Sequence, residues 1–415
     1  MIKLQKKICI VSPSYISSTP RVVKEADALQ KAGFNVRVVF TQGNLAEVKR
    51  FDSLLLENKP WRWQIVKWSS SNPQERLLCG WSKLRHSIAQ RLPQVFYSSG
   101  KFAEYAQGRF YSEMAKLAVS EQADLYIGHY PAGLTVAAYA AFFWKTKLGY
   151  DVEDLYVGEN IAVKEKERIA LIEKRYLPYC AQVTTVSRLV AEEMAQRYNI
   201  HCPLPIHNVF PWKDRESLDG EVKDRKGDAL SLYWYSQVIG EDRGIQDAIK
   251  AAGFLKQKIQ IHLRGYISQN TKNKFVALAK QCGQEDSLYF HSSVPTDELL
   301  SRAAEHDIGL AVDHPLTLSR DISITNKLFF YLLAGLAVAA TDILGQKEVM
   351  ASCPDAGFIY KSNDYHSLAQ WLNALIISPE KVKACKQAAL KAARDKWNWE
   401  AESQKLVENT RGLWQ

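Results

Sequence analysis

Short apolar runs alternate with helical segments along this chain, and the alternation occurs twice. The first series opens with KICIVS at residues 7–12, and the second opens with ALSLYWY at residues 229–235. Buried parallel strands read as continuous apolar runs, and the helices between them return the chain to the same edge of the sheet. The pattern therefore predicts two doubly wound α/β domains, which a chain of 415 residues accommodates.

A polar stretch, PWKDRESLDGEVKDRK at residues 211–226, separates the two series and is typical of a linker. We therefore expect an N-terminal domain over residues 1–211 and a C-terminal domain over residues 212–395. The last strand of the first domain is expected at residues 206–208.

The overall charge and the cysteine pattern limit the class of protein. The balance of 54 Lys and Arg against 45 Asp and Glu suggests an anionic partner, such as a nucleotide sugar, a lipid headgroup or nucleic acid. The seven cysteines never form a CxxC pair, which argues against a disulfide framework or a zinc site and for a reducing cytosol. No run approaches the ~20 apolar residues of a membrane-spanning helix, and the run at residues 8–11 is too short for a signal peptide. We expect a cytoplasmic protein without a metal site, at most peripheral on the inner face of the membrane.

Residues 60–117 combine aromatic and basic side chains. The segment holds nine Lys and Arg against three Glu, a balance of 9 − 3 = +6. Such a composition suits an anionic membrane surface or a lipid-linked acceptor, and it also suits stacking on single-stranded nucleic acid. It equally fits an insertion whose aromatic side chains form core and whose charges are solvated. The sequence favours the membrane over nucleic acid and leaves all three open. The aromatic residues are Trp61, Trp63, Trp68, Trp81, Phe96, Tyr97, Phe102, Tyr105, Phe110 and Tyr111.

The stretch from Arg320 to Gln346 reads RDISITNKLFFYLLAGLAVAATDILGQ. Thr325 is expected to cap a helix whose first turn holds Asn326 and Lys327, and Gly335 is expected to end that helix. The unpaired amides of the first turn and the Lys327 ammonium could together bind a diphosphate. The same pattern also fits an amphipathic helix that only packs.

This stretch carries a family resemblance. TNKLFFYLLAGLAVAATD resembles the segment NK-L-F-x-Y-L-x-A-G-x-P-V of the GT-B glycosyltransferases, in the retaining group related to glycogen and sucrose synthases (family 4-like). The phrase STPRVVKEA, at the first predicted helix, resembles bacterial members of the same group. The resemblance implies the GT-B fold: two Rossmann-like domains with a cleft between them, and a C-terminal helix, here residues 396–415 with Trp397 and Trp399, that crosses back onto the first domain. The sequence differs at the family's Glu-x7-Glu pair, where Ile322 and Phe330 stand.

The resemblance also implies donor-binding residues in the second domain. SQVIGEDRGIQDAIKAA resembles the family's phosphate loop, G-R-L-x-x-x-K-G, with Gln237 in place of its Arg. Arginine is always charged and can grip a phosphate with two hydrogen bonds, although the arginine of this loop could also be a surface charge. The expected donor-binding residues are Arg243, Gly244, Arg264, Thr325, Asn326 and Lys327.

A histidine, His129, ends one predicted strand of the first domain, and a group of acidic residues follows the next strand. In the resembled families a His at such a strand end and the acidic loop after it lie near the transferred sugar and the acceptor, where a carboxylate could take the proton of the acceptor hydroxyl. The acids also fit the N-terminus of a helix, where negative charge is favourable. Arg21, at the start of the first helix, could contact a phosphate or the acceptor, or be a surface charge. The expected catalytic residues are His129, Asp151, Glu153 and Asp154.

The resemblance implies an enzyme that moves a hexosyl or related group from a nucleotide-diphosphate sugar to a hydroxyl acceptor. Retention of configuration, independence of metal and the absence of any cofactor besides the donor are implied with it. The expected partners are the nucleotide sugar and a glycan or lipid-linked acceptor, in the synthesis of a cell-surface polysaccharide or glycolipid. Three alternatives stay open: a degenerate GT-B protein that only binds, a transferase acting on nucleic acid, and a sugar-nucleotide epimerase.

Overall fold

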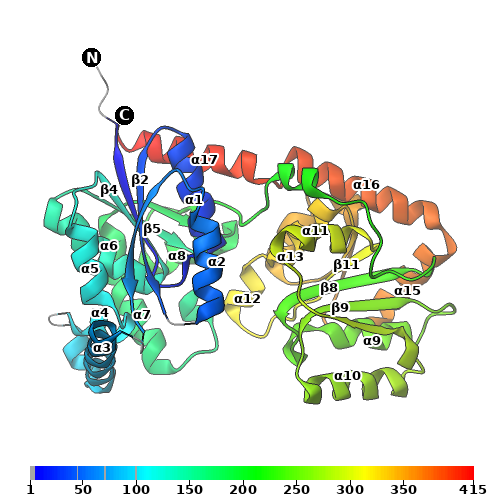
Figure 1. Cartoon of the computed structure of the whole chain (residues 1–415). Coiled ribbons are helices and arrows are strands. Elements are labelled where there is room, and N and C mark those ends of the chain that lie inside the picture. The colour runs from blue at the N-terminus through cyan, green and yellow to red at the C-terminus, as the bar shows by residue number, and fades with distance from the viewer. Residues whose placement is uncertain (1–4, 44, 70–71, 99–100) are drawn as a thin grey trace. The chain divides into compact units, whose positions relative to one another are not determined.

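The computed structural model describes residues 5–43, 45–69, 72–98 and 101–415. The chain divides into two compact units (Figure 1). Unit 1 comprises Met1–Ile206 together with Ser403–Gln415, and unit 2 comprises His207–Glu402. The sequence places its domain boundaries after residues 211 and 395, whereas the units divide after residues 206 and 402.

Unit 1 is built on a seven-stranded parallel sheet with the strand order β3-β2-β1-β4-β5-β6-β7. The order reverses between β1 and β4. In open parallel sheets of this kind, ligands bind at the carboxyl ends of the strands beside such a reversal. The strands are β1 (Lys7–Val11), β2 (Asn35–Gln42), β3 (Arg62–Lys67), β4 (Leu125–His129), β5 (Lys147–Val152), β6 (Cys180–Thr185) and β7 (Leu204–Pro205).

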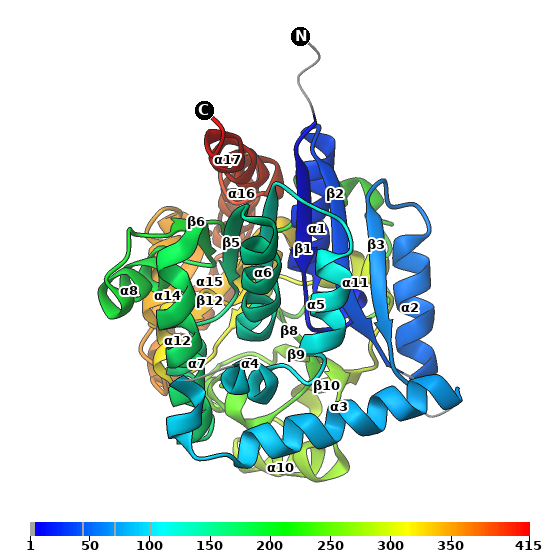
Figure 2. The same cartoon turned by 90° about the vertical axis from the view of Figure 1, so that its left-hand side faces the viewer.

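Helices cover both faces of the unit 1 sheet, with α5 and α6 on one face and α1 on the other (Figure 2). On the α1 side, Ile8 and Ile10 of β1 pack against Val22 and Leu29 in one buried apolar cluster. Each such side chain contributes about 1.5–3 kcal/mol when it leaves water. The helices are α1 (Pro20–Lys31), α2 (Ala46–Leu56), α3 (Pro73–Arg91), α4 (Phe102–Gln107), α5 (Tyr111–Val119), α6 (Tyr130–Trp144), α7 (Val163–Tyr176) and α8 (Arg188–Tyr198).

The last strand of unit 1 is shorter and earlier than the sequence predicts. It covers Leu204–Pro205 rather than residues 206–208. The Ile206 amide still donates to the Thr185 carbonyl at 2.8 Å. The His207 amide donates to the Glu402 carboxylate at 2.8 Å, so this donor is satisfied by a side chain outside the sheet.

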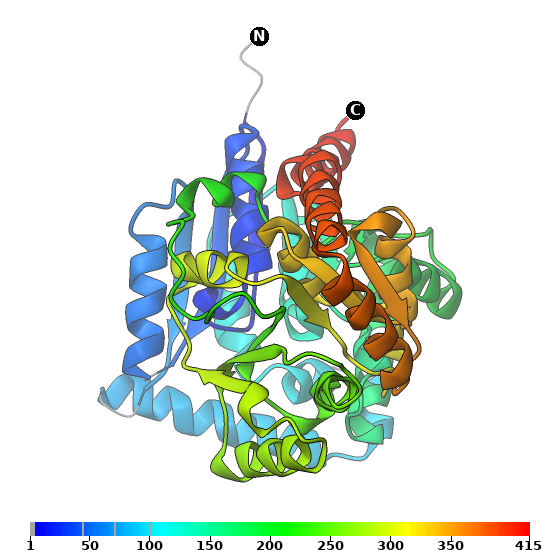
Figure 3. The same cartoon turned by 90° about the vertical axis from the view of Figure 1, so that its right-hand side faces the viewer.

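Unit 2 repeats the plan with a six-stranded parallel sheet in the order β10-β9-β8-β11-β12-β13. Helices lie on both faces of this sheet (Figures 1 and 3), and the order reverses between β8 and β11. The strands are β8 (Ser231–Val238), β9 (Gln260–Tyr266), β10 (Leu288–His291), β11 (Ile308–Ala311), β12 (Ala337–Thr341) and β13 (Gly357–Tyr360). The helices of unit 2 are α9 (Ile245–Ala252), α10 (Gln269–Gln281), α11 (Thr296–Ala304), α12 (Leu318–Ile322), α13 (Asn326–Ala334), α14 (Leu344–Met350), α15 (Tyr365–Ile377) and α16 (Pro379–Asp395). The last helix, α17 (Trp399–Gly412), begins in unit 2 and continues in unit 1.

Helix α13 has the limits that the sequence predicts. It begins at Asn326, directly after Thr325, and it ends at Gly335, which has a φ of 76°. That left-handed conformation is easy for glycine and strained for other residues. The following strand, β12, is buried along its whole length, as the apolar run indicates.

The polar segment expected to be a linker is bound to unit 2. The Glu305 carboxylate accepts hydrogen bonds from the amides of Lys223, Asp224 and Arg225, at 2.9, 2.7 and 3.3 Å. Asp219 forms an ion pair with the buried guanidinium of Arg302. Residues 219–226 are therefore a fixed strap on unit 2, because their polar groups have partners there rather than in water.

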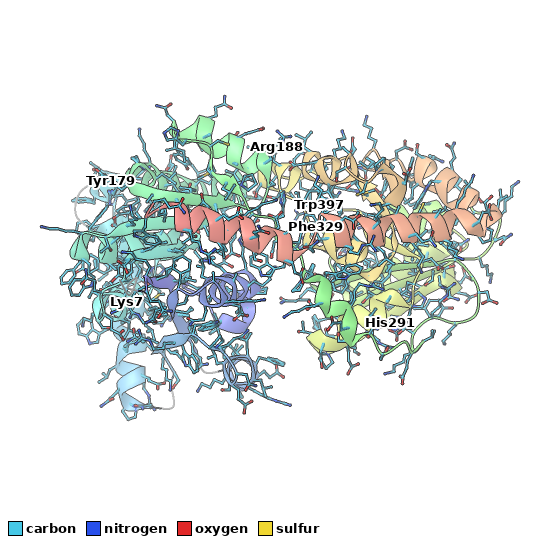
Figure 4. All side chains as sticks on the ribbon, turned by 90° about the horizontal axis from the view of Figure 1, so that it is seen from above. Lys7, Tyr179, Arg188, His291, Phe329 and Trp397 are labelled. Carbon is cyan, nitrogen blue, oxygen red and sulfur yellow. The ribbon has the colours of Figure 1, made fainter. Side chains whose placement is uncertain are left out.

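The predicted C-terminal helix is interrupted once before it reaches unit 1. Between α16 and α17, the indole of Trp397 is buried, and its ring centroid lies 5.3 Å from that of Phe329 (Figure 4). Beyond residue 402 the chain belongs to unit 1, where the Thr410 hydroxyl lies 3.2 Å from the Gln182 side chain and the Trp414 ring lies 6.0 Å from Phe34. Two Rossmann-like units joined in this way confirm the predicted fold class.

No helix among the described residues is long and apolar enough to cross a membrane. The hydrophobic side chains of the helices are instead divided between the two cores and a few exposed positions.

Replacing Trp397 by alanine should destabilise unit 2. The indole is only 4% exposed, and its Nε1 donates to the Ser352 hydroxyl at 3.0 Å. The cavity and the lost hydrogen bond should lower the free energy of unfolding by about 3–5 kcal/mol, measured by urea denaturation. Trp81→Ala is the matched control, because Trp81 is 67% exposed and its loss should cost less than about 0.5 kcal/mol. Equal losses in the two variants would contradict this account.

Candidate functional site

The predicted catalytic residues of unit 1 meet at the carboxyl ends of β4 and β5. His129 is the last residue of β4, and the parallel register pairs it with Asp151 of β5. Helix α1 brings a third residue, Glu25, which lies four residues after Arg21 and therefore on the same helical face. The strand reversal thus gathers charged groups from three elements around one point.

The His129 imidazole is held between carboxylates on both of its nitrogens. Its Nε2 lies 2.6 Å from Glu25, and its Nδ1 lies 2.9 Å from Glu153 and 3.3 Å from Asp151. The side chain is fully buried. Burial alone would lower the pKa of His129, but the three carboxylates outweigh that effect and raise it to about 10. His129 is therefore an imidazolium cation whose two N–H groups are already in use.

Arg21 is a buried partner of Asp151 rather than a surface charge. Its guanidinium donates to the two Asp151 oxygens at 2.5 and 2.7 Å and to the Ile206 carbonyl at 2.7 Å. The Thr184 hydroxyl donates to the same carboxylate at 2.5 Å. Burial alone would raise the pKa of Asp151, but Arg21, His129 and Thr184 hold it below its ordinary value. Asp151 is thus a fixed anion that orients other groups.

Glu153 and Asp154 lie nearer to solvent than His129 and Asp151. Glu153 accepts from His129 through one oxygen and from the Tyr130 hydroxyl, at 3.2 Å, through the other. Asp154 is exposed. Loss of hydration, together with the nearby carboxylates of Glu153 and Glu159, raises the pKa of Asp154 to about 7. Of the four predicted catalytic residues, Asp154 is the one that is exposed as a residue while its carboxyl group has lost hydration, so that its pKa lies near neutral.

A cavity of about 530 Å³ in unit 1 lies beside this cluster. It is lined by the loop after β1, the start of α6 and the aromatic-basic segment. Trp68 and Phe110 form one wall, stacked with ring centroids 5.4 Å apart. The Arg109 guanidinium lies 5.2 Å from the Trp68 ring and 4.9 Å from the Phe110 ring. The lining also includes Tyr156 and Glu159. The sequence indicated the composition of this segment but not the cavity that it helps to form.

In unit 2, two of the predicted donor-binding residues converge on one carboxylate. The Arg243 guanidinium lies 3.8 Å from Asp313, and the Lys327 ammonium lies 3.9 Å from it. Lys327 also lies 5.1 Å from the centroid of the buried Trp234 ring. Burial lowers the pKa of Lys327, and Asp313 opposes this effect. One Asp313 oxygen is buried without a hydrogen bond. The two cations therefore lie close to this carboxylate but do not satisfy both of its oxygens.

The loop that carries Arg243 is pressed against the end of β11. Gly244 has a φ of 72°, and a side chain at this position would place its Cβ 1.7 Å from the Val312 carbonyl oxygen. Only glycine fits there. Arg320 of α12 donates to the Asp242 carboxylate and carbonyl, both at 3.1 Å. Thr325 precedes α13 and makes no side-chain cap bond, and Asn326 is exposed in its first turn.

Arg264 has a different surrounding from the other predicted donor-binding residues. Its guanidinium is buried, pairs with Asp224 of the strap and donates to the Ser292 carbonyl at 2.6 Å. Asp313 was not among the predicted site residues, although it lies two residues after the buried strand β11, which is a usable sequence signal.

The positions of the family's glutamate pair are apolar and buried. Ile322 and Phe330 are 6% and 5% exposed. The Phe330 ring lies 4.6 Å from Tyr235 and 5.3 Å from Phe210, between ring centroids. This position therefore contributes to an aromatic cluster in unit 2 and offers no oxygen to a ligand.

Two groups of side chains have the spacing of metal ligands in the part of the chain that the structure describes. In each group the potential ligand atoms lie within 4.8 Å of one another. Arg21 already pairs with one carboxylate of the first group, and Arg264 and Arg302 pair with the two carboxylates of the second. These guanidinium cations already neutralise carboxylates that would otherwise be available to a metal ion. The groups are Glu25, His129 and Asp151 in unit 1, and Asp224, Glu305 and His306 in unit 2.

No protein-family model matches the sequence, and no curated protein matches it. Solved structures resemble the fold over nearly the whole chain. A glycosyltransferase from Rickettsia africae ESF-5 is 15% identical, with 99% of each chain covered and a TM-score of 0.67. HepE from Anabaena, in complex with UDP and glucose, is 14% identical, with 98% of this chain and 100% of that chain covered and a TM-score of 0.68. Sucrose-phosphate synthase from Thermosynechococcus elongatus is 14% identical, with 99% of each chain covered and a TM-score of 0.66. The chain therefore has the GT-B fold that the sequence predicts.

Replacing His129 by asparagine should destabilise unit 1, because three buried carboxylates lose their shared cation. Loss of one member of a buried ion pair costs about 3–5 kcal/mol. The pKa of His129 rises from 6.5 to about 10 on folding, so its stabilisation is complete below pH 6.5 and disappears as the pH rises through about 10. Hydrogen exchange of the β4 amides should show the wild-type protein losing stability over that range and the variant losing less.

His201→Asn is the control for this measurement, because His201 is an exposed histidine of the same unit. That variant should retain the wild-type pH dependence. If the His129 variant also retained it, the imidazolium would not be the group responsible.

Proposed function

We propose that this chain is a glycosyltransferase that moves a sugar from a nucleotide-diphosphate donor to a hydroxyl acceptor. The observation that carries the proposal is the convergence of Arg243 and Lys327 on Asp313 at the carboxyl edge of the second sheet. Similar folds support it, since HepE from Anabaena has been solved with UDP and with UDP-glucose.

The cations beside Asp313 fit a leaving diphosphate. Their contacts with Asp313 are 3.8 and 3.9 Å long, beyond normal hydrogen-bond length. A diphosphate that bonds Arg243 and Lys327 directly would exchange these weak contacts for short, charge-assisted hydrogen bonds. The unpaired amides at the start of α13 add donors nearby. We propose that the chain's own cations neutralise the charge that develops on the diphosphate, so that transfer needs no metal.

The cavity of unit 1 fits the acceptor. Its aromatic wall, Trp68 and Phe110, suits the apolar faces of a sugar ring, and Glu159 supplies a hydrogen-bond acceptor for hydroxyl groups. Asp154 is the proposed base, because its pKa near 7 lets it take the proton of an attacking hydroxyl at neutral pH. His129 and Asp151 are proposed to position the loop that carries Asp154.

The proposed stereochemistry and the proposed class of acceptor rest on the resemblance of the sequence to the retaining GT-B group. We propose retention of configuration and a glycan or lipid-linked acceptor in the synthesis of a cell-surface polysaccharide or glycolipid. Unit 2 would hold the donor and unit 1 the acceptor.

A second candidate function is donor binding without transfer. Phe330 favours it, because a buried aromatic ring replaces the carboxylate that contacts the donor ribose in the resembled enzymes. Gln237 also removes a cation from the phosphate loop. The two functions differ in one result: the transferase turns over its donor when an acceptor is present, and the binding protein does not.

Replacing Arg243 by alanine should weaken nucleotide-diphosphate binding about 10- to 150-fold, since hydrogen bonds to a charged group are worth about 1.5–3 kcal/mol. A panel of nucleoside diphosphates and their sugars, scored by the rise in thermal midpoint, identifies the ligand first. Calorimetric titration then compares the variants. Arg243→Lys should recover part of the loss, because it restores the charge without the planar fork.

Arg394→Ala is the control, since Arg394 is an exposed arginine of the same unit, on α16. It should bind the nucleotide as the wild type does. The donor site would be misassigned if Arg243→Ala bound equally well, or if no nucleotide of the panel stabilised the folded wild-type protein.

Replacing Asp154 by asparagine should reduce turnover about 10²- to 10⁴-fold, the usual contribution of a general base, with donor affinity unchanged. The wild-type rate should rise with pH through about 7, as Asp154 loses its proton. The rate of the variant should not show this rise. Steady-state rates from pH 5 to 9 would test it. Asp228→Asn, at an exposed aspartate of unit 2, should keep the wild-type profile. An Asp154 variant with the full rate and profile would remove Asp154 from the mechanism.

A further inference from the structure

Helix α3 carries a continuous stripe of exposed apolar side chains. Leu77 and Trp81 are each 67% exposed, and Leu84 and Ile88 are each 52% exposed. Their spacing is i, i+4, i+7 and i+11, which places all four within about 60° of one another around the helix axis. Single exposed apolar residues are ordinary, whereas an aligned set on one helical face indicates an interaction surface.

The other face of α3 fixes the helix on unit 1. Ser82 and Ala89 are buried. The Arg85 guanidinium forms an ion pair of 2.8 Å with Glu113, and His86 Nδ1 lies 2.8 Å from the Tyr105 carbonyl. The exposed stripe is therefore not the inward face of a detached helix. It points outward from a helix that is already packed.

Further exposed apolar side chains follow the C-terminal end of α3. Val95, Phe96 and Phe102 are 71%, 44% and 39% exposed. The Phe96 and Phe102 rings contact each other edge to face, with centroids 6.3 Å apart. Figure 2 shows α3 as a long helix at the periphery of unit 1, with α4 alongside it.

The charge of this region is positive. From residue 73 to residue 101 the sequence holds five Lys and Arg and one Glu, a balance of 5 − 1 = +4. Arg76, Lys83, Arg91 and Lys101 are exposed. An apolar stripe with exposed cations on the same helix is the pattern of a helix that lies in the headgroup layer of an anionic membrane.

We propose that α3, together with Val95, Phe96 and Phe102, binds the surface of an anionic lipid bilayer. The stripe would enter the boundary between headgroups and acyl chains, and the cations would contact lipid phosphates. The charge argues against a second copy of the chain as the occupant, because two such surfaces would bring like charges together. Membrane binding stands on these observations alone and does not require the proposed transferase activity.

The bilayer surface and the acceptor cavity are connected through Arg109. This residue forms part of the cavity wall, and its guanidinium donates to the Cys79 carbonyl of α3 at 2.9 Å. A membrane-bound α3 would hold the cavity close to the lipid surface. If the proposed function holds, an acceptor carried on a lipid is the class that this arrangement suits.

The test is flotation of the purified full-length chain with vesicles of phosphatidylcholine, with and without phosphatidylglycerol. The wild type should bind the anionic vesicles, and less so as salt is added. The double variant Trp81→Glu with Leu84→Glu should reduce the bound fraction at least about 10-fold, because it places charge in the apolar layer. Lys83→Glu with Arg91→Glu should abolish the preference for anionic vesicles.

Ile377→Glu is the matched control, because Ile377 is 76% exposed on α15 of unit 2. It should bind vesicles as the wild type does. All variants should keep the wild-type unfolding midpoint, since the replaced side chains are exposed. Turnover with a water-soluble acceptor, where it occurs, should also be unchanged, so that failure of the membrane proposal and failure of the transferase proposal are separate results.

Three outcomes would overturn the proposal. The first is a wild-type protein that does not bind anionic vesicles. The second is a double variant that binds them as well as the wild type does. The third is a sedimentation measurement in which the wild type is a dimer and the double variant a monomer, since a second copy would then cover the stripe.

Discussion

The fold of unit 1 depends on a buried group of charges at the carboxyl ends of its central strands. Arg21, Asp151 and His129 bind one another directly or through shared carboxylates, and they come from α1, β5 and β4. Each charge would cost several kcal/mol if it were buried alone. The group is therefore stable only when it is complete, and its completion fixes the ends of these elements relative to one another. The start of α6, with Tyr130, and the loop that carries Asp154 gain a defined position from it.

Contact length distinguishes the structural cations from those available to a ligand. Arg21 grips Asp151 at 2.5 and 2.7 Å in a buried site, and Arg264 is equally enclosed beside Asp224. Arg243 and Lys327 approach Asp313 only to 3.8 and 3.9 Å. A short buried pair has little to gain from a new partner, whereas a long contact leaves hydrogen-bonding capacity for an anion.

The aromatic side chains of residues 60–117 lie in three different surroundings. The composition of the segment alone therefore could not show where each of them lies. Trp61 and Tyr97 are buried and belong to the core. Trp68 and Phe110 line the cavity of unit 1. Trp81 and its neighbours on α3 are exposed and form the proposed membrane surface. The interpretation as core is correct for the first set of residues, and the proposed lipid surface involves the third.

The sequence by itself determined the features that depend on neighbours along the chain: the alternation of strands and helices, the limits of α13, and the glycine at its end. Periodicity and capping are local, so they can be read from local residues. Only the tertiary structure decided which charged side chains are buried and which groups they pair with. Glu25 binds His129 across 104 positions of sequence, the polar stretch before residue 226 is bound to unit 2, and the His207 amide, just after the last strand of unit 1, donates to Glu402. Burial and the choice of partner depend on distances in space, and these are set by the order of the strands in the sheet.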